Sequence, residues 1–141
     1  MRSSPGNHSL ALLLVILNTF IIAACSAEAP RIPFDSLDFA LADAGSGEKL
    51  FNQSNSEAPS CTACHSITGE SSGIGNSLAG IAAVAAERAA SQTAEEYLYW
   101  SILRPGRRLV AGYSNIMFAG YEDSLEAADI ADLIVYLLTL D

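Results

Sequence analysis

Residues 61–65 read Cys61-Thr62-Ala63-Cys64-His65, a Cys-x-x-Cys-His pattern that restricts what the rest of the chain can be. Two thiols at this spacing can add across the two vinyl groups of one haem, and the adjacent histidine can then bind the iron. A zinc site needs about four ligands, and no Cys or His follows His65. A redox dithiol would follow a strand, whereas residues 52–60 form a polar stretch. We therefore predict one covalent haem c, with thioethers from Cys61 and Cys64 and with His65 as an axial iron ligand.

The start of the chain predicts export. Arg2 precedes an apolar run over residues 10–24, which is too short for a transmembrane span and typical of a signal peptide. The run ends in Ile22-Ala23-Ala24-Cys25, which resembles the bacterial lipobox, whose cysteine is diacylated and becomes the mature N-terminus. We predict a lipoprotein signal peptide over 1–24 and a lipid on Cys25 that anchors the protein to the outer face of the cytoplasmic membrane. An uncleaved anchor helix and an ordinary leader cut near Ala27 are the alternatives.

The number of cysteines and the net charge are consistent with a lipid-anchored haem protein. Two thiols for haem and one for lipid leave no pair for a disulfide, despite an oxidising compartment. Residues 25–141 contain 16 acidic and six basic residues, a formal charge of −10. Such a surface repels nucleic acid and favours a protein partner that presents a basic patch.

Residues 25–43 are expected to form a lipid-anchored tether. The segment contains Pro30 and Pro33 and has no sustained helical period. It also contains apolar side chains that a free linker does not need, which indicates contact with the domain or with a partner. These side chains are Ile32, Phe34, Leu37, Phe39 and Leu41.

Four helices are expected after this tether. The first is short and contains Gly47, Leu50 and Phe51, and the second runs from about residue 79 or 81 to residue 90. Thr93 and Glu96 form a capping-box pattern at the start of the third, which must stop before Pro105. Asp123 or Ser124 is expected to cap the last helix. One side of that helix is lined by Ile130, Leu133, Ile134, Leu137 and Leu138.

The order of these features resembles the class I cytochrome c family over residues 44–141. The family has Gly and Leu-Phe on a first helix that crosses the last one, and here the matches are Gly47 and Leu50-Phe51. The resemblance implies an all-α fold in which about four or five short helices pack around one haem. The family also has a Gly-Pro-x-Leu motif whose proline carbonyl accepts a hydrogen bond from the proximal histidine. In the matching stretch, residues 75–78, Asn76 stands in place of that proline.

The sixth iron ligand is expected to be Met117. It is the only methionine beyond the initiator, and it precedes the last helix, where the family places its axial methionine. Lys49 is the only other strong donor once His8 is removed with the leader. A lone methionine that merely fills a core is the alternative.

Other candidates for contact with the haem lie on or near the same loop. Arg104, Arg107 and Arg108 are each a candidate for an ion pair with a haem propionate or a solvated surface side chain. Trp100, Tyr113 and Asn115 are candidate hydrogen-bond donors or simple packing residues.

Two classes of function follow from these residues. With His65 and Met117 both on the iron, no position is left for oxygen, and the protein is a non-enzymatic, membrane-tethered carrier of single electrons. Its partners would be respiratory or photosynthetic redox proteins, met by diffusion or within a membrane complex, and the apolar tether residues favour the complex. A haem enzyme or gas sensor is the alternative and would require a displaceable sixth ligand.

Overall fold

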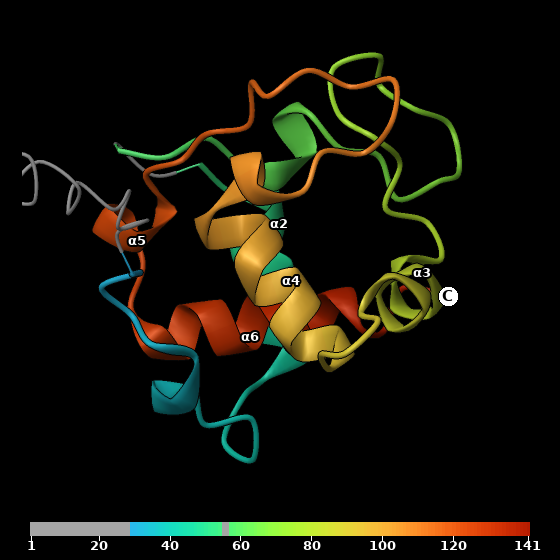
Figure 1. Cartoon of the computed structure of the whole chain (residues 1–141). Coiled ribbons are helices and arrows are strands. Elements are labelled where there is room, and N and C mark those ends of the chain that lie inside the picture. Colours follow the sequence, from blue (N-terminus) through green and yellow to red (C-terminus); the bar gives the residue numbers. More distant parts are fainter. Residues whose placement is uncertain (1–28, 55–56) are drawn as a thin grey trace, which may run out of the picture.

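The computed structural model describes residues 29–54 and 57–141 (Figure 1), so residues 1–24 and Cys25 lie outside the described residues. Within them the chain forms five α-helices and three 3₁₀ turns and no strand, which confirms the all-α fold. The elements are η1 (Phe34–Ser36), α2 (Ala44–Asn52), η2 (Cys61–Ala63), α3 (Ile81–Arg88), α4 (Ala94–Leu103), η3 (Pro105–Arg107), α5 (Tyr121–Ser124) and α6 (Ala127–Leu137). In this part of the chain every helix is too short or too polar to cross a bilayer.

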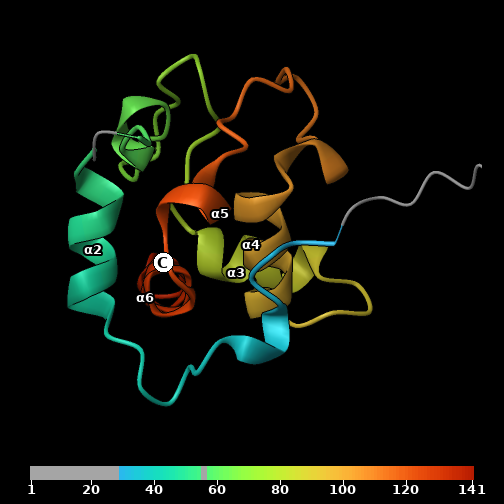
Figure 2. The ribbon, with the colours of Figure 1, turned by 90° about the vertical axis from the view of Figure 1, so that its left-hand side faces the viewer.

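Helices α2 and α6 cross in direct contact, and Figure 2 shows α6 end-on beside α2. Gly47 is buried in this crossing, where a Cβ atom would lie 2.0 Å from the carbonyl oxygen of Asp132. The N–H of Asp43 donates to Asp132 Oδ1 at 2.7 Å. The Asp43 side chain caps α2 by accepting from the N–H of Ser46, and this bond lowers the pKa of Asp43. A glycine on α2 and an aspartate on α6 therefore set how closely the two helices approach.

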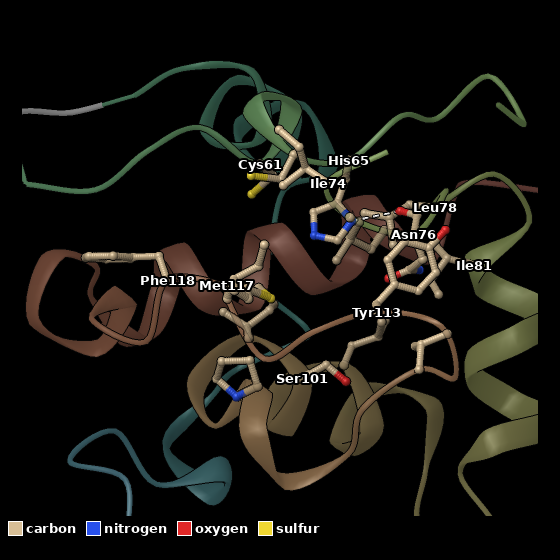
Figure 3. Close-up of a pocket in the computed structure, with 18 of the residues that line it drawn as sticks. Cys61, His65, Ile74, Asn76, Leu78, Ile81, Ser101, Tyr113, Met117 and Phe118 are labelled. Atoms are coloured by element: carbon tan, nitrogen blue, oxygen red, sulfur yellow. Dashed lines mark hydrogen bonds between the residues drawn. The ribbon is translucent and has the colours of Figure 1, made fainter. Parts of the chain in front are cut away.

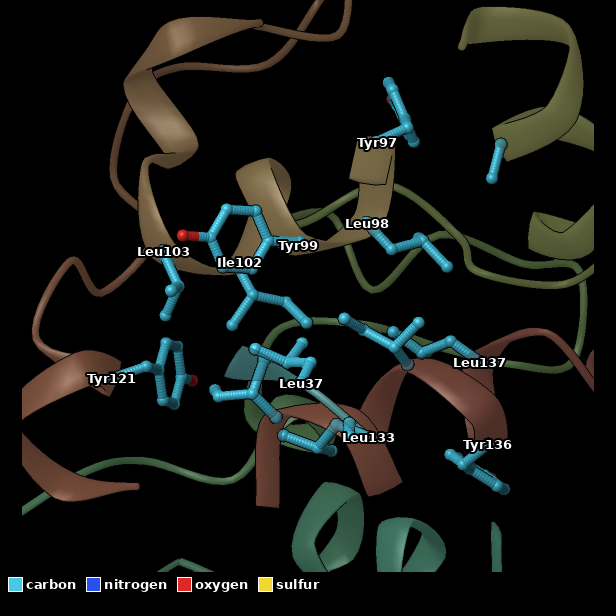
Figure 4. Close-up of a cluster of buried hydrophobic side chains, with 14 of the residues drawn as sticks. Leu37, Tyr97, Leu98, Tyr99, Ile102, Leu103, Tyr121, Leu133, Tyr136 and Leu137 are labelled. Carbon is cyan, nitrogen blue, oxygen red and sulfur yellow. The ribbon is translucent and has the colours of Figure 1, made fainter. Parts of the chain in front are cut away.

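The apolar side of α6 supplies most of the core. Four of the five residues predicted to line this side are buried, and Leu138 is half-buried. Figure 4 shows Leu133 and Leu137 facing Leu98 and Ile102 of α4. Helices α2, α4 and α6 thus share one core.

The predicted start of the last helix was wrong. Asp123 and Ser124 do not cap it but belong to a separate short helix, α5, and α6 begins after Glu126. The Glu126 side chain accepts from the N–H of Asp129, while the Asp129 side chain accepts from the N–H of Glu126 at 2.9 Å. This reciprocal capping box satisfies the N–H groups of Glu126 and Asp129, and the helix starts there because Glu126 itself has an extended backbone.

Helices α3 and α4 lie where the sequence predicts them. Thr93 caps α4 by accepting from the N–H of Glu96 at 3.2 Å, as expected. The Glu96 side chain does not complete a capping box but accepts from the indole N–H of Trp100 at 3.3 Å. Helix α4 ends at Leu103, because Arg104 precedes a proline and adopts a non-helical conformation.

The segment before α2, which we call the strap (residues 29–43), packs on the helices. Leu37 is buried in the core, and the ring of Phe34 meets the edge of the Tyr99 ring with centroids 5.3 Å apart. The Tyr99 hydroxyl donates to the carbonyl of Ile32 at 2.7 Å. Leu41, in contrast, is 82% exposed. Apart from Leu41, the apolar side chains of the strap are explained by contacts within the chain, so they give no support to a fixed partner.

Candidate functional site

Cys61, Cys64 and His65 lie on one tight turn in the wall of a cavity. The N–H groups of Cys64 and His65 both donate to the carbonyl of Cys61, at 3.1 and 2.9 Å, and so close the turn η2. Figure 3 shows Cys61 and His65 side by side at this wall. Neither of these two cysteines is in a disulfide. Burial raises the pKa of the Cys61 thiol to about 11, so this group is uncharged near neutral pH, as an apolar wall requires.

The loop after the turn orients the imidazole of His65. Its Nδ1 lies 2.8 Å from the carbonyl oxygen of Asn76, a contact drawn as a dashed line in Figure 3. A carbonyl oxygen can only accept, so Nδ1 carries the proton and Nε2 keeps its lone pair for a metal. Asn76 therefore supplies, from its backbone, the bond that a proline carbonyl makes in the motif it resembles.

Gly75 lets this loop approach the imidazole. A Cβ atom at this position would lie 2.7 Å from Cε1 of His65. Two backbone bonds tie the loop to the turn, from the N–H of Gly75 to the carbonyl of Cys64 at 2.9 Å and from Leu78 to Ser66 at 2.7 Å. These bonds restrain the loop although Asn76 lacks the fixed backbone angle of proline.

Met117 lies across the cavity from His65. It is half-buried in the loop between η3 and α5, and Figure 3 shows its side chain and the imidazole pointing into the same space. Lys49, the other candidate donor, is exposed on α2 and does not line the cavity. Among the described residues, the cavity thus has one histidine and one methionine in its wall.

The rest of the cavity wall is mainly apolar. The space, including its opening to solvent, is about 1300 Å³. Its apolar lining includes Phe51, Leu78, Ile81, Leu98, Ile102, Val110, Phe118, Leu133 and Leu137. Three further lining residues are well exposed, Ile74 at 49%, Leu109 at 55% and Ile116 at 67%. A large apolar cavity with few polar groups suits a flat, mostly apolar ligand.

The three loop arginines have different surroundings. Arg104 pairs with Glu122 at 2.8 Å, and the guanidinium of Arg107 lies 3.9 Å from the centre of the Trp100 ring. Neither lines the cavity, whereas Arg108 does, and its Nη1 donates to the carbonyl of Arg88 at 3.2 Å. Of the three, Arg108 is therefore placed to pair with a carboxylate of a ligand in the cavity.

Arg88 is a cavity residue that the sequence reasoning missed. It ends α3, and it lies seven residues after Ile81 and three after Ala85, both of which are buried. Residues at this spacing share one helix face. Although Arg88 is exposed, its place on the same helix face as Ile81 and Ala85 was therefore a usable signal. Among the described residues, Arg88 and Arg108 are the two arginines in the cavity wall.

The three candidate hydrogen-bond donors differ in whether they line the cavity. Tyr113 lines the cavity and donates from its hydroxyl to Ser71 Oγ at 3.1 Å, which joins the two loops that face each other across the opening. Asn115 lines the cavity as well. Trp100 lies outside it, between Glu96 and Arg107.

These residues fit a covalently attached haem. The two thiols sit beside an imidazole whose Nε2 is free, a thioether faces it, and the walls between them are apolar. Arg88 and Arg108, which both line the cavity, would provide positive charge for the propionates of a bound haem. No residue that the resemblance assigned to haem attachment lies away from the cavity.

Comparison with known proteins supports the same assignment. The family model for cytochrome c matches residues 44–141, which cover all the residues that line the cavity. A search of curated proteins finds no significant match to this chain. The match covers more than half of the chain, and we conclude that the chain belongs to the cytochrome c family.

Proposed function

We propose that this cytochrome c is a membrane-anchored monohaem carrier that passes single electrons between redox proteins and uses Met117 as its sixth iron ligand. Membership of the family establishes covalent haem c and, in general, electron transfer. The haem supplies a metal that alternates between ferric and ferrous states. The observation that supports the finer proposal is the placement of His65 and Met117 on opposite sides of one cavity.

Ligation by Met117 favours electron transfer over reaction at the iron. A thioether is a soft donor that stabilises ferrous iron, and together with histidine it raises the reduction potential. The apolar wall disfavours the extra positive charge of ferric iron and has the same effect on the potential. His65, held by Asn76, needs little rearrangement when the charge of the iron changes.

Carbon monoxide distinguishes this proposal from a haem enzyme or gas sensor. We expect the ferrous protein to keep its spectrum when carbon monoxide is added in equimolar amount, because Met117 occupies the sixth position. The ferric protein should also have the weak far-red band of a sulfur–iron bond. A stoichiometric carbon monoxide complex, together with the absence of that band, would favour the enzyme or sensor and reject Met117 as the ligand.

The membrane anchor is part of the same proposal. The lipobox pattern at residues 22–25 supports a lipid on Cys25. Only residues 25–28 then separate this lipid from the strap, and four residues can span at most about 14 Å between the anchor and the folded domain. Such a short connection keeps the haem domain near the membrane and so favours partners whose redox centres lie close to the membrane surface. These partners can belong to a stable complex or be met by diffusion.

We expect radioactive palmitate to label the wild-type protein and not the Cys25→Ser variant, because the thiol is the site of lipid attachment. Ser26→Ala is the matched control and should label normally. The measurement is the label per covalent haem in the purified protein. Equal labelling of Cys25→Ser and wild type would show that the lipid is attached elsewhere, and a wild-type protein without label would leave an uncleaved anchor helix or an ordinary leader.

The opening of the cavity is the surface we propose for docking. Ile74, Leu109 and Ile116 are exposed there, and the charged residues that line the cavity with them are Arg88 and Arg108. The acidic surface that favours a basic partner therefore does not extend over the cavity wall. A partner that docks at this opening would place an apolar area against it and meet the acidic residues only further out.

A further inference from the structure

The loop that contains Met117 has few long-range backbone contacts. It runs from Arg104, at the end of α4, to Glu122, in the first turn of α5 (Figure 1). Among the described residues its turn-forming backbone hydrogen bonds join residues only two or three apart, such as Tyr113 to Val110. A loop of this kind depends on side chains and on its two ends for a defined position.

The two ends of this loop are joined by an ion pair. Arg104 Nη1 lies 2.8 Å from Glu122 Oε1, and the side chains are 26% and 12% exposed. A charged hydrogen bond that is mostly shielded from water is worth more than one at the surface. Next to Glu122, the ring of Tyr121 meets the edge of the Phe118 ring with centroids 5.0 Å apart. Through Tyr121, the ion pair is thus connected to Phe118, the residue that follows Met117.

The strap adds a second bond to Glu122. The backbone N–H of Arg31 donates to Glu122 Oε2 at 2.9 Å, and the Arg31 side chain pairs with Asp123. Tyr99 is 1% exposed, and its hydroxyl restrains the strap by donating to the carbonyl of Ile32. Burial alone would raise the pKa of Glu122, but the bonds from Arg104 and Arg31 outweigh it and lower that pKa. Glu122 is therefore charged near neutral pH, and both of its oxygens have partners.

We propose that Arg104 and Glu122 form a clasp that positions Met117 for the iron, and that the strap locks this clasp. The inference rests on the proposed ligation by Met117. Neither clasp residue lines the cavity, so each acts through the loop and not by contact with the iron. When the clasp is broken, the loop samples more open arrangements, and Met117 is displaced more easily.

Imidazole binding to the ferric holoprotein measures how often the loop opens. An external ligand binds only the open form, so its apparent affinity rises in proportion to the open fraction. We expect Glu122→Gln to raise the imidazole affinity about tenfold, because it replaces a charged acceptor with a neutral one and leaves Arg104 without a counter-charge. Tyr99→Phe, which only frees the strap, should raise it by a smaller factor and serves as a second variant should Glu122→Gln fold poorly.

Asp123→Asn is the matched control, since it removes the same charge from the adjacent residue. Asp123 and its partner Arg31 are 61% and 63% exposed, so we expect little change in imidazole affinity. Equal affinities for Glu122→Gln and Asp123→Asn, with the far-red band present in both, would overturn the clasp and leave Met117 as the ligand. A wild-type protein without that band would overturn both proposals.

Discussion

Replacing Met117 with alanine is expected to abolish the far-red band and to lower the reduction potential by roughly 0.2 V, within the range of about 0.8 V that axial ligands control. The change removes the soft donor that stabilises ferrous iron and lets water or a harder ligand take its place. It also removes a half-buried side chain from the cavity wall. The measurement is a potentiometric titration of the purified holoprotein, followed by its visible spectrum.

Ile116→Ala is the control for this substitution. It shortens an apolar side chain in the same loop, one position away, but Ile116 is 67% exposed and has no donor atom. We expect its band and its potential to match those of the wild type. If Met117→Ala also kept the band, another residue would be the ligand and Met117 would be a core residue only.

Replacing Gly47 with alanine should lower the free energy of unfolding by about 3 kcal/mol or more. The new methyl group would lie 2.0 Å from the Asp132 carbonyl oxygen and 2.8 Å from Cβ of Tyr136, so α2 and α6 must move apart. Because Phe51, on the same helix, lines the cavity, the shift also disturbs the wall around the haem. Guanidinium unfolding of the holoprotein, read from helical circular dichroism, gives the change.

Gly45→Ala provides the comparison on the same helix. Gly45 is exposed, and a methyl group there would meet only Asp43 Oδ1, at 3.3 Å. We expect a stability between the wild-type value and about 1 kcal/mol above it, because alanine favours helix. A loss as large as that of Gly47→Ala would mean that glycine matters for the conformation of α2 and not for the crossing.

The features that the sequence predicted well depend on neighbours in the chain. Cys61, Cys64 and His65 are adjacent, so their gathering on one turn follows from their spacing. Thr93 caps α4 because its hydroxyl oxygen and the Glu96 N–H that donates to it are only three residues apart. The proton on His65 could likewise be anticipated, because the bond uses the backbone of Asn76, which every residue possesses.

What could not be predicted depends on contacts distant in the chain or on competition between equal signals. Asp123, Ser124 and Glu126 can each cap a helix, and the sequence does not show that Asp129 reciprocates with Glu126. The partner of Arg104 is 18 positions away, and that of Ile32 is Tyr99. Such pairs form only after the helices have packed, and no local pattern identifies them.

The strap changes what counts as the folded unit of this protein. The family match begins at residue 44, yet Leu37 is in the core and Tyr99 on α4 is covered from the other side of that boundary. The region that the family model matches is therefore smaller than the region that shares one hydrophobic core. The segment that lies outside the family match therefore contributes part of the hydrophobic interior of the protein.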